Sequence, residues 1–138
     1  MKWKLDARLE SASLEIGNMR VSHVRLVDDS RWLWLTLMPR RTGITEIHDL
    51  VEGDIVQSAL ESSRVAQFLK QYSNCRKINT AAIGNIVDQL HIHVVARNEG
   101  DANWPGPIWG HGEAVPYEKS DCERLLADLE KGLKPFLV

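Results

Sequence analysis

The stretch Gln89-Leu90-His91-Ile92-His93-Val94-Val95-Ala96-Arg97 alternates polar and aliphatic side chains at a spacing of two over its first half. In a β-strand, this spacing places Gln89, His91 and His93 on one face and the aliphatic side chains on the other. The aliphatic face fits a protein core. Imidazole groups have an unperturbed pKa near neutrality, so they can attack, transfer a proton or bind a metal. The stretch therefore predicts a strand with one buried face and one chemical face.

Length and composition limit the possible organisation of the chain. The sequence has 138 residues, of which 43% are hydrophobic and 26% are charged, which suits one globular core. We therefore predict a single domain over residues 1–138. The net charge of −2 gives no general attraction to nucleic acid or anionic membranes. No signal-peptide core or membrane span is visible near the N-terminus, so a cytoplasmic location is expected.

The first half of the chain predicts a β-hairpin followed by a long helix. Residues 19–27 and 32–38 are rich in β-branched and aliphatic side chains and are separated by a polar turn. A helical spacing of apolar residues follows, and it predicts a helix from about Leu50 to Gln71. Asp49 and Glu52 have the spacing of an N-cap and its reciprocal glutamate.

The second half predicts another hairpin, a long loop and a final helix. Residues 77–83 and 89–97 are strand candidates joined by a glycine and asparagine turn. Residues 98–116 are a loop with aromatic anchors, and Ser120 is expected to cap the last helix. The predicted fold is α+β, with helices on one sheet face and the other face open to a ligand or second subunit. Cys75 and Cys122 lack metal-like spacing and are expected to be free thiols.

The histidine stretch resembles the signature of the histidine triad family of nucleotide hydrolases and transferases, with Gln89 at the position of the first histidine. Residues 34–41 and 47–50 are similar to the family's nucleotide-pocket strand and helix entry, and residues 79–85 to its phosphate-contacting hairpin. The resemblance implies the family's fold, an antiparallel sheet with a long helix after the first hairpin and a C-terminal helix. It also implies a homodimer.

The resemblance implies that His91 is the nucleophile and that His93 supports the nucleotidyl-histidine intermediate, a phosphoramidate. The residues lead independently to His91, because it is central in the polar row and a histidine nucleophile needs no metal. Gln89 belongs to the same catalytic row. However, glutamine cannot titrate near neutral pH, so it can hold a leaving group but cannot protonate one.

Contacts to the substrate are also implied by the resemblance, and they involve Asn79, Asn85, Trp104 and either Asp28 or Asp29. Arg97 lies on the same face as His91 if strand geometry persists, and its guanidinium suits a phosphate. These side chains would surround the phosphate, the sugar or the leaving group. Trp32, Trp34 and Trp109 are interpreted instead as packing residues.

The leading hypothesis is an enzyme, a nucleotide hydrolase or nucleotidyl transferase acting at the α-phosphate, with no cofactor, no nucleic acid and no membrane as partner. An alternative is a nucleotide-binding or regulatory protein with little turnover, because Gln89 and Ile86 depart from the family pattern. A plainer interpretation makes His91 and His93 sheet histidines with hydrogen-bond partners. A metal site would need a third ligand, and the candidates Asp88, His48 and His111 have no recognised spacing.

Overall fold

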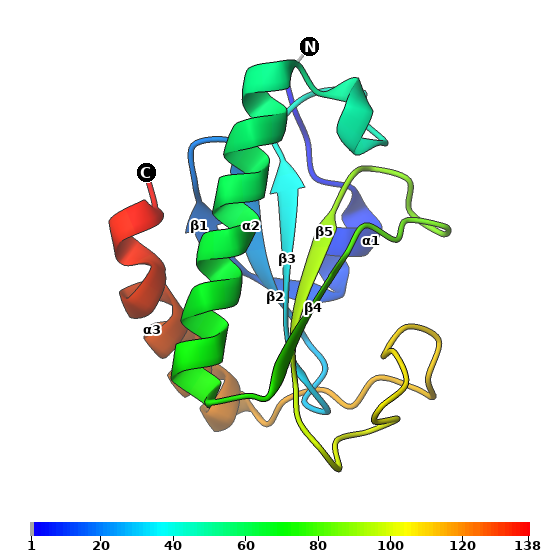
Figure 1. Cartoon of the computed structure of the whole chain (residues 1–138), viewed down its shortest axis with the longest axis vertical. Helices are drawn as coiled ribbons and strands as arrows, with labels where there is room; N and C mark the ends of the chain where they lie inside the picture. The colour runs from blue at the N-terminus through cyan, green and yellow to red at the C-terminus, as the bar shows by residue number, and fades with distance from the viewer. Residues whose placement is uncertain (1) are drawn as a thin grey trace.

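The computed structural model describes residues 2–138 and contains one antiparallel sheet of five strands in the order β1-β2-β3-β5-β4 (Figure 1). Each strand pairs antiparallel with its neighbours. The strands are β1 (Ser13–Asn18), β2 (Ser22–Val27), β3 (Leu33–Pro39), β4 (Lys77–Ala81) and β5 (Ile92–Arg97). Together with the helices, this arrangement confirms the predicted α+β fold.

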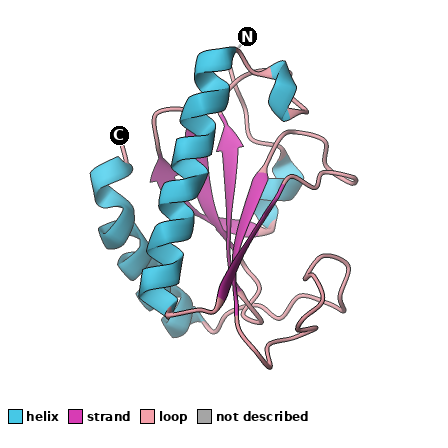
Figure 2. Ribbon diagram, viewed as in Figure 1, coloured by secondary structure: helices cyan, strands magenta, loops and turns pink. Residues whose placement is uncertain are grey.

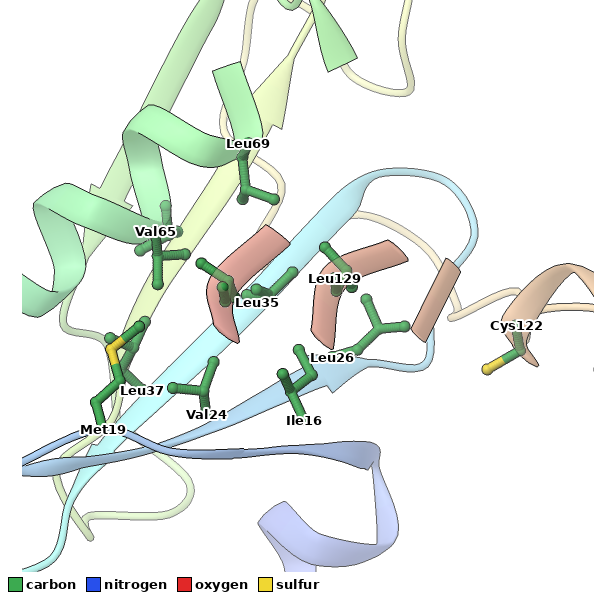
Figure 3. Packing of buried hydrophobic residues seen from close by; sticks show 12 residues of the cluster. Ile16, Met19, Val24, Leu26, Leu35, Leu37, Val65, Leu69, Cys122 and Leu129 are labelled. Atoms are coloured by element: carbon green, nitrogen blue, oxygen red, sulfur yellow. The ribbon is translucent and has the colours of Figure 1, made fainter. Parts of the chain in front are cut away.

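Two long helices, α2 (Glu52–Ser73) and α3 (Lys119–Leu133), cover one face of the sheet (Figures 1 and 2). The core lies between these helices and the inward side chains of the central strands, as Figure 3 shows for Leu26, Leu35, Val65 and Leu69. Cys75 and Cys122 are buried free thiols, as expected. Since apolar side chains alternate along the strands, the opposite sheet face is left for polar groups.

Short elements complete the chain: α1 (Ala7–Ser11), η1 (Ile47–Asp49) and η2 (Lys134–Phe136). The N-terminal segment, residues 2–8, lies on the sheet face opposite to α2, because Trp3 packs against His23 of β2 with ring centroids 6.0 Å apart. Neither this segment nor β1 was part of the sequence-based prediction. No helix within residues 2–138 is long and apolar enough to cross a membrane.

Both predicted helix caps are wrong. The Asp49 carboxylate accepts hydrogen bonds from the backbone of Thr45 and Glu46, so it caps η1, and Val51 precedes α2 without a side-chain cap. Helix α3 begins before Ser120, because the backbone N–H of Cys122 already bonds to the Glu118 carbonyl at 2.9 Å. A cap residue three positions before a glutamate also occurs in turns that adjoin a helix. The spacing alone therefore does not distinguish such a turn from the first turn of the helix.

Candidate active site

The two histidines lie together on the sheet face opposite to the long helices. His93 belongs to β5 and pairs with Thr36 of β3, whereas His91 comes one residue before β5 begins. Strand β5 therefore starts at Ile92 and not at Gln89, and residues 82–91 form a loop over the strand end. Each histidine is only 6% exposed, and the ring centroids are 4.8 Å apart at an interplanar angle of 71°.

The ring of His91 is held in a single tautomer by the backbone. Its Nδ1 lies 2.7 Å from the Gln89 carbonyl oxygen, which can only accept a hydrogen bond. Nδ1 therefore carries the proton and donates it, and Nε2 is left with a free lone pair. The Gly84 backbone lies close to this ring, because a Cβ built on Gly84 would be in ordinary van der Waals contact with His91 Cε1, at 3.5 Å. The bond therefore fixes the orientation of the ring and, in neutral imidazole, the position of its lone pair.

Both ring nitrogens of His93 have protein partners. Nε2 donates to the Ile83 carbonyl at 3.1 Å, and Nδ1 accepts from the indole N–H of Trp34 at 3.0 Å. Burial, together with the nearby charge of His91, lowers the pKa of His93 to about 4, against the raising effect of its bond to Ile83. His93 is therefore neutral at pH 7 and fixed in orientation, and its ring lies edge to face with the His91 ring.

The lowered pKa of His93 predicts a loss of stability in mild acid. An unfolded histidine binds a proton near pH 6.5 while the folded one does not until about pH 4, so the unfolded state gains protons first as the pH falls. We expect the free energy of unfolding to drop by about 2 kcal/mol from this group between neutral pH and about pH 5. Urea unfolding of the parent and His93→Gln at both pH values measures it. An equal drop in both proteins would contradict the assignment.

Three adjoining clefts surround the histidines. The first has a volume of ≈ 450 Å³ and is lined by Trp34, Ile83, Gly84, Asn85, Ile86, Val87, His91, His93, Trp109 and Gly110. The second, of ≈ 470 Å³, shares Trp34, Trp109 and Gly110 with the first and includes Asp28 and His111. The third, of ≈ 250 Å³, is polar and shares Gly84, Asn85 and His91 with the first. The first two volumes are typical of small-molecule sites.

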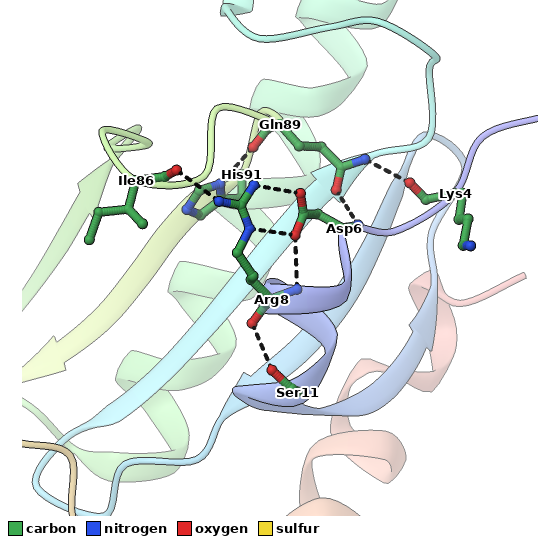
Figure 4. Close-up of polar contacts among 7 residues, drawn as sticks. All are labelled: Lys4, Asp6, Arg8, Ser11, Ile86, Gln89 and His91. Carbon is green, nitrogen blue, oxygen red and sulfur yellow. Dashed lines mark hydrogen bonds and ion pairs between the residues drawn. The ribbon is translucent and has the colours of Figure 1, made fainter.

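Some of the predicted site residues come together in these clefts. Asn85 lines the two clefts that meet at His91. Asp28 lines the second cleft, where its carboxylate accepts a hydrogen bond from the Tyr117 backbone at 2.9 Å. Gln89 lines the polar cleft, but its side-chain amide is turned to the N-terminal segment, where Oε1 accepts from the Asp6 N–H at 2.9 Å and Nε2 donates to the Lys4 carbonyl at 2.8 Å (Figure 4).

Arg97, Asn79 and Trp104 form a separate cluster and line none of these three clefts. The Arg97 side chain is 1% exposed and donates to Asp101, to the Asn79 side chain and to the Gly106 carbonyl. Its guanidinium lies 5.5 Å from the Trp104 ring centroid. The prediction had Arg97 binding the phosphate of the substrate. In the structure, the loop after β5 folds back, and its Asp101 and Gly106 accept hydrogen bonds from the Arg97 guanidinium.

Trp109 and the N-terminal segment are parts of the candidate site that the sequence pattern did not indicate, and Trp34, interpreted as a packing residue, also lines two of the clefts. Trp109 packs edge-on against His93 with ring centroids 5.3 Å apart. Its indole N–H is buried and has no hydrogen-bond partner within the described chain. Trp109 is an isolated aromatic residue in a loop and carries no periodic signal, so only the fold brings it next to His93. Among residues 2–138, no three His, Cys, Asp or Glu side chains are grouped to hold a metal ion.

Gly84 offers a direct test of the packing around His91. A Cβ at this position would lie 2.7 Å from the Val87 carbonyl oxygen, so Gly84→Ala must displace the loop that touches the His91 ring. We expect any turnover that depends on His91 to fall about 10-fold or more, because small displacements of reacting groups are costly. Gly53→Ala is the matched control, since its Cβ would meet no atom within 4 Å. Equal activities of the two variants would refute this view of the loop.

The sequence matches one family model and is similar to curated proteins. The HIT domain model matches residues 8–100. The chain is 30% identical over 99 residues to a Mycobacterium tuberculosis protein named AP-4-A phosphorylase, and the match covers 67% of this chain and 50% of that protein. The chain therefore spans about half the length of the curated relatives it matches.

Solved structures extend the similarity to nearly the whole chain. A histidine triad protein from Sinorhizobium meliloti is 43% identical, with a TM-score of 0.92, and the alignment covers 95% of this chain and 97% of that one. A histidine triad protein from Marinobacter aquaeolei is 34% identical, with a TM-score of 0.96, and the alignment covers 99% of each chain.

Proposed function

The chain belongs to the HIT domain family, and on that premise we propose that it is a nucleotide hydrolase or nucleotidyl transferase with His91 as its nucleophile. The observation that carries the proposal is the bond between His91 Nδ1 and the Gln89 carbonyl at 2.7 Å. In the neutral ring, this bond places the free lone pair on Nε2, which is the tautomer that a histidine nucleophile at these clefts requires. The relative named AP-4-A phosphorylase supports a nucleotide as the substrate class.

The proposed reaction has two displacement steps at the α-phosphorus. The lone pair of His91 Nε2 forms a P–N bond while the bond from phosphorus to the leaving oxygen breaks, and the leaving group takes that electron pair. Water or another acceptor then attacks phosphorus, the P–N bond breaks, and Nε2 regains its lone pair. The acceptor's proton passes to solvent or product. His93 stays neutral and holds the His91 ring in place throughout.

The clefts suggest how the substrate is oriented. The cleft that contains Asp28 and Trp109 suits a nucleoside, because an aromatic wall can pack on a base and a carboxylate can accept from ribose hydroxyl groups. The α-phosphate would then lie at His91, where Asn85 and the loop backbone around Gly84 provide hydrogen-bond donors. A cytoplasmic location and a homodimer are part of the same proposal, and light scattering on purified protein tests the dimer.

The decisive experiment traps the covalent intermediate. The purified protein is mixed with the p-nitrophenyl ester of AMP, quenched without acid, because a phosphoramidate is acid-labile, and analysed by intact mass spectrometry. We expect a mass increase of one adenylyl group, located on His91 by peptide mapping. An adduct on another residue, or turnover without any adduct at the earliest times, would contradict the mechanism.

The second candidate function is a nucleotide-binding protein with little turnover. It is favoured by Gln89, whose side-chain amide is turned away from His91 and bonds to the N-terminal segment. This candidate predicts nucleotide binding, measured by calorimetry, without release of p-nitrophenol and without an adduct. Release of p-nitrophenol that depends on His91 would exclude it.

A further inference from the structure

We propose that Arg8, held beside His91 by an N-terminal segment that Gln89 anchors, contacts the leaving group of the nucleotide and stabilises its negative charge. The inference rests on the proposed function and names a specificity-determining residue for it. It also defines the preferred substrates, which are nucleotides whose leaving group departs as an anion, such as a phosphate or polyphosphate. Nucleoside phosphoramidates, whose leaving group is an amine, would be poor substrates.

Gln89 connects the N-terminal segment to the nucleophile. Its side chain bonds to the Lys4 carbonyl and to the Asp6 N–H, while its own carbonyl accepts the Nδ1 proton of His91 (Figure 4). These contacts join residues 83 and 85 positions apart in the sequence. Position 89 therefore serves as an anchor for a segment that reaches His91 from outside the sheet.

The anchored segment presents Arg8 at the edge of the clefts. Asp6 accepts from Arg8 Nε at 3.1 Å and from Nη2 at 3.0 Å, and Arg8 Nη1 donates to the Ile86 carbonyl at 3.3 Å. Ile86 lines the same cleft as His91. The hydrogen bonds from Arg8, and more weakly the charge of His91, lower the pKa of Asp6. The Arg8 side chain is 60% exposed, so it retains N–H groups for a ligand.

Among the charged residues around His91, Arg8 is the cation placed to bind a leaving group. No Lys or Arg of residues 2–138 lines the two clefts that meet at His91, whereas Glu46 and Asp88 both line the polar one. Arg31 and Arg8 are both ion-paired, with Asp29 at 2.8 Å and Asp6 at 3.0 Å. Arg31, however, lines the nucleoside cleft, which His91 does not line, and its side chain is 18% exposed against 60% for Arg8. A phosphate chain that extends past His91 toward the polar cleft would approach Glu46 and Asp88. The Arg8 N–H groups that remain after its bonds to Asp6 and Ile86 could bind that chain.

The chemistry of Arg8 and Gln89 also determines which kind of leaving group can depart from the phosphorus. When the P–N bond forms, the electron pair of the breaking bond goes to the leaving group. A phosphate oxygen can accept that pair as an anion bound to Arg8 N–H groups. An amine needs a proton as it leaves, and neither Gln89 nor a guanidinium gives up a proton at neutral pH. The residues therefore favour anionic leaving groups.

The test compares two substrates in matched variants. ATP has a diphosphate leaving group, whereas the p-nitrophenyl ester of AMP releases a delocalised phenolate that needs little help. We expect Arg8→Met to lower kcat/KM for ATP about 10- to 100-fold, as the loss of a charge-assisted hydrogen bond implies, and to leave the ester within about 3-fold. Arg8→Lys should restore part of the ATP activity. Arg124→Met, which changes an arginine with a 74% exposed side chain, should behave as the parent.

A second set of variants tests the role of Gln89. Gln89→Ala removes both anchoring bonds, so it should lower ATP turnover in the same way as Arg8→Met, and the double variant should be no worse than the poorer single one. If the losses of ATP turnover in the two single variants multiplied in the double variant, the proposed anchoring role of Gln89 would be wrong. Equal losses on both substrates in Arg8→Met, or no loss on either, would overturn the role of Arg8.

The outcomes also separate this inference from the proposed function. If His91→Ala is inactive while Arg8→Met equals the parent on ATP, only the inference fails. If the parent shows no turnover of either substrate, the proposed enzyme fails, and calorimetry with a non-hydrolysable ATP analogue then decides on Arg8. Weaker binding by Arg8→Met but not by Arg124→Met would support the contact, and unchanged binding would refute it.

Discussion

The variant His91→Ala is expected to lower kcat for the p-nitrophenyl ester of AMP about 10³-fold or more and to form no adenylyl adduct. The reason is geometric. Both nitrogens of His93 are bonded to protein groups, so of these two histidines it is His91 that offers an oriented free nitrogen at the clefts. Without it, water must attack the phosphorus directly. Release of p-nitrophenol and intact mass spectrometry measure the two effects.

The controls for this prediction distinguish chemistry from folding. His48→Ala removes a histidine whose side chain is 83% exposed and should turn over as the parent does. Nucleotide affinity of His91→Ala should change little, because the clefts keep their other walls. Added imidazole should restore part of the activity of His91→Gly by occupying the vacated space. A His91→Ala protein as fast as the parent would remove His91 from the mechanism.

The sequence predicted the parts of the site that depend on strand periodicity. The spacing of His91 and His93 placed both rings on one face, because alternation along an extended chain is a local property. It did not predict that the chain leaves the strand at His91. The loop that ends there is fixed by distant contacts, such as the hydrogen bond from the Leu90 N–H to the Ile44 carbonyl, and such contacts have no local pattern.

The contribution of the N-terminal segment could not be predicted for the same reason. Residues 4–8 have no apolar periodicity, and their bonds with Gln89, which accepts from the Asp6 N–H and donates to the Lys4 carbonyl, join parts of the chain that are 83 and 85 positions apart. The sequence showed that Gln89 could not act as an acid. Only the folded chain shows what its amide binds instead. An unusual residue in a motif can thus signal a new structural role as well as a lost chemical one.

Arg97 is the residue for which the sequence and the structure differ most, and Arg97→Met is expected to lower the free energy of unfolding by about 3–5 kcal/mol. Burial by itself would raise the pKa of Asp101, but the hydrogen bonds from Arg97 and from the Asn98 N–H lower it. Removing the arginine leaves this carboxylate, whose side chain is 14% exposed, without its cationic partner. Urea unfolding at neutral pH measures the loss.

A double-mutant cycle decides between a structural and a substrate-binding role for Arg97. Asp101→Asn removes the charge that Arg97 balances, so Arg97→Met should be less damaging in that background, with a coupling of about 1–3 kcal/mol. If Arg97 instead bound the phosphate of the substrate, Arg97→Met would raise KM while the free energy of unfolding stayed unchanged.

The Arg97 guanidinium also donates to the Gly106 carbonyl, in the loop that leads to Trp109. Its loss should therefore weaken nucleotide binding only as a consequence of the loosened loop, so that ATP and the AMP ester are affected equally.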